Sequence, residues 1–142
     1  MKRFKLIASG YLLLIKEGKV LLSKRKNTGY EDGNYGLPSG HLEPHETVRD
    51  CCAREAKEEI GITIKAEDLE LVHMMHRRQL DERIDFFFVT SVWEGQIVNM
   101  EAEKCAELSW FAVDSLPLNT IGYIRKTIEQ YQANILYSEF GW

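Results

Sequence analysis

Apolar residues along the chain follow two kinds of spacing, one typical of strands and the other typical of helices. Short runs rich in branched and aromatic residues, bounded by turn-forming residues, are typical of strands. The predicted strands cover 6–15, 20–23, 35–40, 62–64, 69–75, 84–93 and 107–112. The run Phe86-Phe87-Phe88-Val89 is apolar at every position, so the strand over 84–93 is expected at the centre of a sheet, where both faces are buried.

Two segments have helical spacing instead. No Gly or Pro occurs between Thr47 and Gly61, so we predict a helix that Thr47 caps at its start and Gly61 ends. A second helix is predicted over 121–131, with a buried stripe formed by Ile121, Ile124, Ile128 and Tyr131. This order of elements predicts an α/β (α+β) fold in which two helices flank a mixed sheet. The aromatic tail up to Trp142 can cover an edge of that sheet.

The first predicted helix has an acidic face. Glu55, Glu58 and Glu59 follow at spacings i, i+3 and i+4, so their carboxylates project from one side of the helix. Like charges at these spacings destabilise a helix by roughly 0.2–0.5 kcal/mol per pair, and Arg54 can neutralise only part of the charge. A hard cation such as Mg²⁺, which binds a few carboxylates together with substrate phosphates, can supply the rest. For an isolated Glu-x-x-Glu-Glu, a solvated acidic face is the commoner explanation.

Length and charge limit the class of protein. The 142 residues are expected to form one domain, 1–142. The composition, with 44% hydrophobic and 28% charged residues, is ordinary for a globular chain. A net charge of −4 argues against a nucleic-acid polymer as partner, because such a polymer requires a basic surface. A small phosphorylated substrate is still compatible with this charge. The sequence leaves the oligomeric state open, a homodimer included.

The cysteines and histidines indicate no chemistry of their own. Cys51, Cys52 and Cys105 are odd in number and lack metal-binding spacing, so a reduced, cytoplasmic protein is expected. At least one of the two helical cysteines should face the sheet. His73 and His76 lie three apart in a predicted strand and point to opposite faces, so they should not share an ion. No apolar segment approaches the ~20 residues that span a bilayer, so no membrane association is expected.

A wider spacing pattern surrounds the acidic helix. Five residues separate Gly40 from Glu46, and seven separate Glu46 from Arg54-Glu55-Ala56. One residue then precedes Glu58-Glu59, and one more precedes Gly61-Ile62. This pattern over 40–62 resembles the Nudix box at every defined position. The resemblance implies a Nudix hydrolase with an α/β/α sandwich fold, in which Mg²⁺ or Mn²⁺ is held against a nucleoside diphosphate linked to another group.

The resemblance also assigns roles to residues. The expected metal ligands are Glu55, Glu58, Glu59 and the carbonyl of Gly40. Glu58 or Glu59 can double as the general base, although some Nudix enzymes use a Glu outside the box. Glu101 and Glu103 lie in a predicted loop and can take that role or be solvated.

Two further box residues are expected to hold the catalytic residues in position. By resemblance, Arg54 and Glu46 form a salt bridge that steadies the loop and orients the catalytic carboxylates. Ser39 departs from the Pro-Gly-Gly sequence that precedes the helix in many Nudix enzymes. Because Ser39 lies outside the defined box positions, we expect the change to be tolerated.

The substrate class is indicated by residues downstream of the box. ADP-ribose enzymes of the family carry a Pro there, and dinucleoside polyphosphate hydrolases carry a Tyr. This chain has no Pro between Pro44 and Pro117 and no Tyr between Tyr35 and Tyr123. The remaining interpretation is the MutT-like group, which converts nucleoside triphosphates to monophosphates and pyrophosphate. The alternatives are hydrolysis of a nucleotide sugar or another capped diphosphate, and a nucleotide sensor without turnover.

Substrate contacts are less specific in the sequence. The sequence around Asn119 resembles the neighbourhood of the Asn that contacts the purine in MutT. Asn119-Thr120 can equally cap the final helix. Arg25 belongs to a basic triplet that can meet a phosphate or end a strand in solvent. The arginines in the polar hairpin or loop over 77–83 are further candidates for a phosphate contact.

Overall fold

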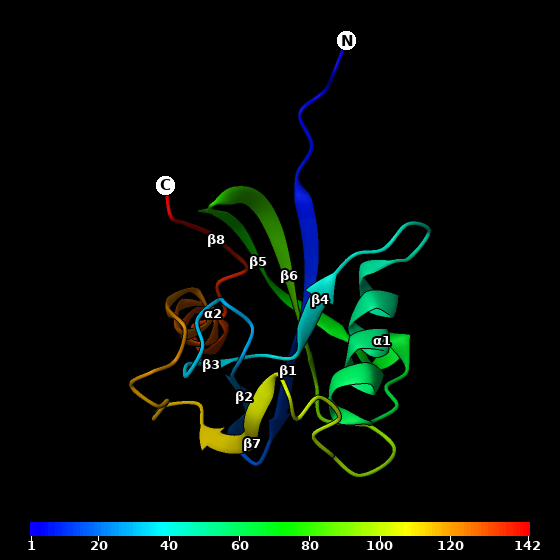
Figure 1. Ribbon diagram of the computed structural model, residues 1–142, viewed down its shortest axis with the longest axis vertical. Helices are drawn as coiled ribbons and strands as arrows, with labels where there is room; N and C mark the ends of the chain where they lie inside the picture. The colour runs from blue at the N-terminus through cyan, green and yellow to red at the C-terminus, as the bar shows by residue number, and fades with distance from the viewer.

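The computed structural model describes residues 1–142 as a mixed β-sheet with one helix on each side (Figure 1). The strands are β1 Ile7–Lys16, β2 Lys19–Arg25, β3 Tyr35–Gly36, β4 Ser39–His41, β5 Glu70–Gln79, β6 Asp81–Thr90, β7 Cys105–Ala112 and β8 Tyr137–Phe140. The helices are α1 Val48–Ile60 and α2 Gly122–Gln132, with a short 3₁₀ turn, η1, at Ala66–Asp68. The predicted sandwich is confirmed. Neither helix has the length and hydrophobicity needed to cross a membrane.

The strand pairing shows where neighbouring strands of the sheet separate. The order is β3-β2-β1-β6-β5-β8, with β4 added to β1 and β7 added to β2. β6 pairs with β1 on one side and β5 on the other, so the predicted central strand is confirmed. β1 pairs with β2 only at Ile15 and Lys16, while its first half pairs with β4 through 9–11. Where β1 pairs with β4 instead, β2 and β7 diverge from β1.

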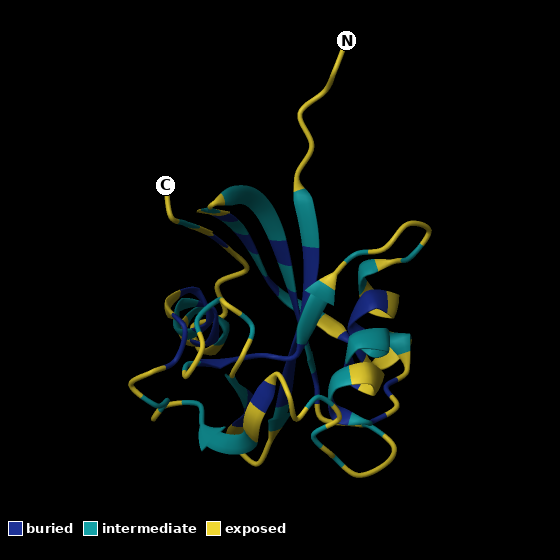
Figure 2. Ribbon diagram, in the orientation of Figure 1, coloured by how far each residue is buried: buried dark blue, intermediate teal, exposed yellow.

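The sheet has a hydrophobic cluster on each face. Successive residues of β1 alternate between them, because side chains along a strand point to opposite sides. Tyr11 and Leu13 belong to the cluster beneath α2, whereas Leu12 and Leu14 belong to the cluster beneath α1. Figure 2 shows the buried strands running between the two helices. Each fully buried Leu contributes roughly 1.5–3 kcal/mol, so both helices are held mainly by these two clusters.

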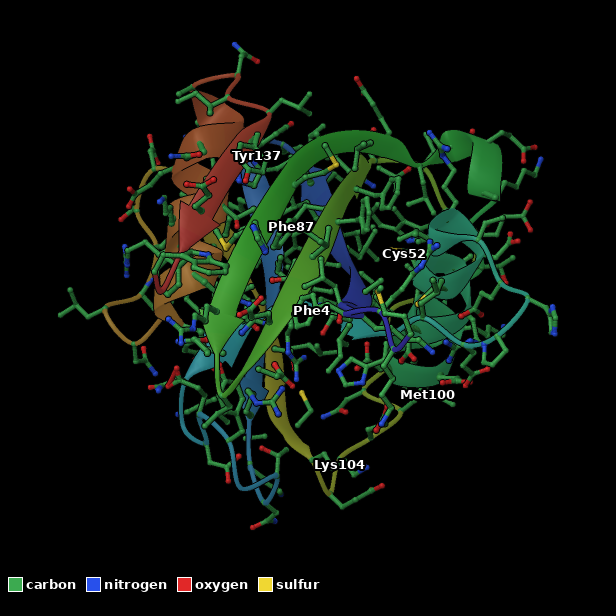
Figure 3. All side chains as sticks on the ribbon, turned by 90° about the horizontal axis from the view of Figure 1, so that it is seen from above. Phe4, Cys52, Phe87, Met100, Lys104 and Tyr137 are labelled. Carbon is green, nitrogen blue, oxygen red and sulfur yellow. The ribbon has the colours of Figure 1, made fainter.

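Helix α1 has the bounds that the sequence predicts. The Thr47 side chain accepts a hydrogen bond of 3.1 Å from the Asp50 backbone N–H, and Gly61 ends the helix in a left-handed conformation with φ of 75°. Cys51 and Cys52 are both buried, which confirms the expectation for the helical cysteines. Cys52 points from the helix toward the sheet in Figure 3. A Cβ on Gly10 would lie 2.8 Å from the Cys52 sulfur, so Gly10 lets α1 approach β1 closely.

The prediction that Asn119-Thr120 caps the second helix is wrong. The residue at the N-cap position of α2 is Ile121, and no side chain caps the helix. The Asn119 amide instead donates a hydrogen bond of 2.8 Å to the Gly33 carbonyl, and the Thr120 hydroxyl donates to Pro117. The physical reason is that the helix begins at Gly122, so Asn119 lies two residues before the N-cap position, and its side-chain N–H is held by a loop carbonyl far away in the sequence. Asn119 therefore ties the loop before β3 to the segment before α2.

One predicted strand differs in detail from the structure, and the segment expected as a hairpin or loop is a hairpin. The strand expected over 35–40 is broken into β3 and β4 at Leu37-Pro38, where proline has no N–H to donate to a neighbouring strand. The segment 77–83 is a tight hairpin in which Leu80 alone forms the turn, with φ of 65°. The aromatic tail forms β8, which pairs with β5 at the sheet edge.

We predict that removing the α1 cap lowers stability without changing the fold. Thr47→Ala leaves the Asp50 N–H without its acceptor, so the free energy of unfolding should fall by about 1 kcal/mol in urea titration. Thr47→Ser is the matched control, since it keeps the hydroxyl and should lose much less. Equal losses in the two variants would contradict the assignment of the hydroxyl as the cap.

Candidate active site

A cleft of about 390 Å³ opens where β2 diverges from β1, between α1 and the loop that leads into β7. Its charged lining residues are Arg25, Glu55, Glu58, Glu59, Glu101 and Lys104. Figure 3 shows the loop with Met100 and Lys104 beside α1, and the Met100 N–H donates to the Glu59 carbonyl. The cleft thus unites the box carboxylates with two predicted residues from elsewhere, Arg25 and Glu101.

Two other predicted residues lie outside this cleft. Glu103 is exposed, and its backbone carbonyl accepts from the Asn27 side chain. Asn119 is exposed and is occupied by the hydrogen bond to Gly33. Lys104 lines the cleft but was missed in the sequence, where it is an ordinary Lys between loop residues. Its one sequence signal is that it follows the acidic segment containing Glu101.

Arg54 holds the box loop to the helix. Its Nε lies 2.7 Å from Glu46 Oε2 and its Nη2 lies 3.0 Å from Glu46 Oε1, which makes a two-pronged ion pair. The same guanidinium reaches two helix carboxylates, with Nη1 at 2.7 Å from Glu55 Oε1 and 3.4 Å from Glu58 Oε2. Hydrogen bonding from Arg54 lowers the pKa of Glu46 to about 2. The expected ion pair is therefore formed, while its catalytic role stays a prediction.

Glu59 lies deepest of the three helix carboxylates. Its Oε2 accepts a hydrogen bond of 2.9 Å from the backbone N–H of Ser39. Burial, together with the negative charges of Glu55 and Glu101, raises the pKa of Glu59 to about 8. A carboxylate that is removed from water and faces other carboxylates is costly to ionise. A cation at this position would lower that cost.

Gly40 leaves the space that the Glu55 side chain occupies. A Cβ on Gly40 would collide with the Glu55 carboxylate, so only glycine lets β4 and the helix side chain come so close. The Gly40 carbonyl accepts a hydrogen bond of 3.5 Å from the Cys51 thiol, and its role as a metal ligand stays a prediction.

The side chains do not converge on a single point in the structure. No three of the acidic, His or Cys side chains are arranged to share one ion. Glu55 and Glu58 contact Arg54 instead, and Glu59 contacts Ser39. The donor set nevertheless fits a hard divalent ion, since all of its ligands are oxygens and the buried Glu59 lacks a cation.

A second cavity of about 470 Å³ adjoins the cleft and shares Arg25 and Ser39 with it. Tyrosines and arginines dominate its lining, namely Tyr11, Tyr30, Tyr123, Arg25, Arg77 and Arg83. Arg77 and Arg83 come from the predicted polar hairpin. The three tyrosines were not identified from the sequence, because they come from β1, a loop and α2. The site therefore consists of an acidic cleft joined to a tyrosine-lined cavity.

The chain is similar to known proteins over most of its length. The NUDIX domain model matches residues 5–131. An ADP-ribose pyrophosphatase from Methanocaldococcus jannaschii is 35% identical over 108 residues, which cover 74% of this chain and 61% of that protein. An NAD-capped RNA hydrolase NudC from Chromobacterium violaceum is 28% identical over 112 residues, covering 78% of this chain and 40% of that protein. The chain thus spans less than two thirds of the length of these relatives.

Solved structures give the same result for the fold. The crystal structure of a MutT NUDIX hydrolase from Burkholderia pseudomallei superposes with a TM-score of 0.81 at 25% identity, covering 89% of this chain and 98% of that one. A MutT protein from Methanosarcina mazei superposes with a TM-score of 0.78 at 24% identity and supports the fold alone. Family members generally use divalent metal ions. With the family model matching most of its length, the chain belongs to the Nudix family of hydrolases.

Proposed function

We propose that this protein hydrolyses a phosphoric anhydride bond in a nucleotide with the help of a divalent metal ion. The proposed substrate is a nucleoside triphosphate, which would be converted to a nucleoside monophosphate and pyrophosphate. One observation carries the choice of substrate: a single tyrosine-lined cavity adjoins a cleft whose charged residues are mostly carboxylates. This arrangement favours a substrate with one organic group and a chain of phosphates.

The metal-binding role is assigned to oxygen ligands. Glu55, Glu58, Glu59 and the Gly40 carbonyl would hold Mg²⁺ or Mn²⁺. When bound, such an ion neutralises phosphate oxygens and acidifies water. Arg25 and Lys104 line the same cleft and would neutralise phosphate oxygens that point away from the carboxylates. Electrostatic compensation of this kind is needed because a phosphate chain repels a nucleophile of the same sign.

The proton of the attacking water needs an acceptor within the cleft. We assign this role to Glu58, whose carboxylate is the most exposed of the three, whereas Glu59 already accepts a hydrogen bond from Ser39. The water oxygen forms a bond to phosphorus, the anhydride P–O bond breaks, and the proton passes to the Glu58 carboxylate. Pyrophosphate leaves with the electrons of the broken bond. Arg54 acts as a positioning residue, because it fixes Glu46 and two helix carboxylates together.

A capped diphosphate is the second candidate. The relatives named ADP-ribose pyrophosphatase and NAD-capped RNA hydrolase favour it, since their names describe a diphosphate between two organic groups. The acidic cleft would then have to accommodate the second group. The same carboxylates would serve either substrate, so the two candidates differ in specificity and not in chemistry.

The decisive measurement is a release screen in Mg²⁺ over (d)NTPs, ADP-ribose, nucleotide sugars and dinucleoside polyphosphates. We expect pyrophosphate from a triphosphate and a loss of kcat on the order of 10²-fold or more in Glu58→Gln, since a general base contributes that much. Glu67→Gln is the control, because Glu67 is exposed and lines neither cavity. If only capped diphosphates are turned over, the substrate class is a capped diphosphate and not a nucleoside triphosphate. Absence of turnover on all of them would contradict the proposed function.

A second test concerns the contact between Gly40 and Glu55. Gly40→Ala should displace the Glu55 carboxylate and weaken Mn²⁺ binding, measured by electron paramagnetic resonance, by on the order of tenfold. The fold should persist, because Gly40 lies in a short strand at the edge of the site. Gly122→Ala is a matched control, since an added Cβ there meets its nearest neighbour at an ordinary 3.6 Å. Unchanged Mn²⁺ affinity in Gly40→Ala would argue against Glu55 as a ligand.

A further inference from the structure

Arg25 lies at the boundary between the two hollows, because its side chain lines both the acidic cleft and the tyrosine-lined cavity. The other two arginines of the cavity are neutralised within the protein. Arg77 forms an ion pair of 2.6 Å with Asp85, and it is buried. Arg83 forms an ion pair of 2.6 Å with Asp81. Arg25 has no such carboxylate partner, so its positive charge is available to a ligand that extends from one hollow into the other.

The loop that follows β2 fixes Arg25. We call residues 26–34 the Arg25 loop, because they hold this side chain. Arg25 Nε donates a hydrogen bond of 2.8 Å to the Tyr30 carbonyl, and its Nη2 donates one of 3.1 Å to Thr28 Oγ1. Where the loop returns to the sheet, the Arg25 backbone N–H donates to the Asn34 carbonyl at 2.9 Å. The Nη1 group is left without a hydrogen bond inside the protein, so the guanidinium is held in place and still has N–H groups to donate.

Asp32 in turn holds Thr28. Its carboxylate accepts a hydrogen bond of 2.5 Å from the Thr28 hydroxyl, and it also accepts one of 2.9 Å from the Gly29 N–H. Because the hydroxyl proton is donated to Asp32, Thr28 Oγ1 keeps its lone pairs for the Arg25 N–H. Hydrogen bonding from Thr28 and Gly29 lowers the pKa of Asp32, so this carboxylate is ionised at neutral pH. Asp32 therefore acts on the guanidinium through the Thr28 hydroxyl.

The Arg25 loop also contributes to the lining of both hollows. Tyr30 lines the tyrosine-lined cavity, and its hydroxyl donates a hydrogen bond of 3.2 Å to the side chain of Gln79 on β5, which lines the same cavity. Thr28 lines the acidic cleft. Asp32 is exposed and lines neither hollow. The loop thus places its ligand-facing residues on either side of Arg25 and keeps Asp32 behind them.

A fixed guanidinium without a carboxylate partner suits a phosphate. Its planar set of N–H groups matches phosphate oxygens, and such charge-assisted hydrogen bonds are strong. Holding the side chain in the free protein reduces the rotamer freedom that is lost when a ligand binds. In a nucleotide whose base lies in the tyrosine-lined cavity and whose leaving phosphates lie in the acidic cleft, the group at the boundary is the phosphate attached to the sugar. This phosphate stays on the nucleoside monophosphate after hydrolysis.

We propose that Asp32 and Thr28 are positioning residues that hold Arg25 against the phosphate attached to the sugar of the substrate. The inference rests on the proposed function, because it assumes a nucleotide that occupies both hollows. The contact with Arg25 distinguishes a nucleotide from an uncharged nucleoside. Since Asp32 lines neither hollow, its whole effect on a ligand has to pass through Arg25.

The test is a double-mutant cycle on binding in Mg²⁺, measured by isothermal titration calorimetry with AMP, GMP, CMP and UMP and with the corresponding nucleosides. For the base that binds best, the wild type should bind the monophosphate at least about tenfold more tightly than the nucleoside. Arg25→Ala should abolish this preference, and Asp32→Ala should reduce it by about threefold. Because Asp32 acts through Arg25, the double variant should lose no more than Arg25→Ala alone. Asp114→Ala, which removes an exposed aspartate outside both hollows, should leave the preference unchanged.

Nucleoside monophosphates are products of the proposed reaction, so their binding separates this inference from the proposed function. If no triphosphate is hydrolysed but the preference and the non-additive cycle hold, the proposed reaction fails and the contact with Arg25 stands. The inference is overturned if Asp32→Ala leaves the preference unchanged, if the two losses add, or if the wild type binds nucleosides and monophosphates equally. Thr28→Val keeps the size of the side chain and removes only the hydroxyl between Asp32 and Arg25. It should give the same loss as Asp32→Ala and takes its place in the cycle if that variant does not fold.

Discussion

The close packing of α1 against β1 fixes the position of the acidic side chains in the cleft. Gly10 on β1 leaves room for Cys52, and Gly40 on β4 leaves room for the Glu55 carboxylate. Thr47 and Gly61 set where the helix begins and ends, so the rotation of its acidic face relative to the strands is determined. A helix moved outward by one methyl group would separate Glu55 and Glu59 from the β4 backbone. An ångström-scale shift of this kind can cost on the order of 10²-fold in rate.

Charge balance explains how the helix tolerates three neighbouring carboxylates. Arg54 contacts Glu46, Glu55 and Glu58, and it therefore neutralises part of the acidic face. Glu59 has only the Ser39 N–H, and its pKa is raised accordingly. The bidentate contact with Glu46 anchors the guanidinium, so Glu55 and Glu58 can exchange Arg54 for another cation while the loop remains in place. The ion pair and the proposed metal site are therefore compatible.

Local signals in the sequence were sufficient for the acidic helix but not for the second cavity. The bounds of α1 follow from Thr47 and Gly61, because capping depends only on neighbouring backbone groups. Asn119 was misassigned because its partner, Gly33, lies 86 residues away, and an amide suits either position equally well. Tyr11, Arg77 and Tyr123 meet only through the pairing of β1 with β6, β6 with β5, and the docking of α2. Spacing predicts which face a residue occupies but not which distant residue shares that face.

Unfavourably placed polar groups lie at both cavities of this structure. Glu59 is buried among other carboxylates at the cleft, while Ser9 and Asp85 are buried without full hydrogen bonding beside the second cavity. The stabilising contacts are elsewhere, in the two hydrophobic clusters that hold α1 and α2 to the sheet. A protein under selection for stability alone would pair Glu59 with a basic residue. Since the chain does not, the buried Glu59 carboxylate is best explained as part of the proposed metal site.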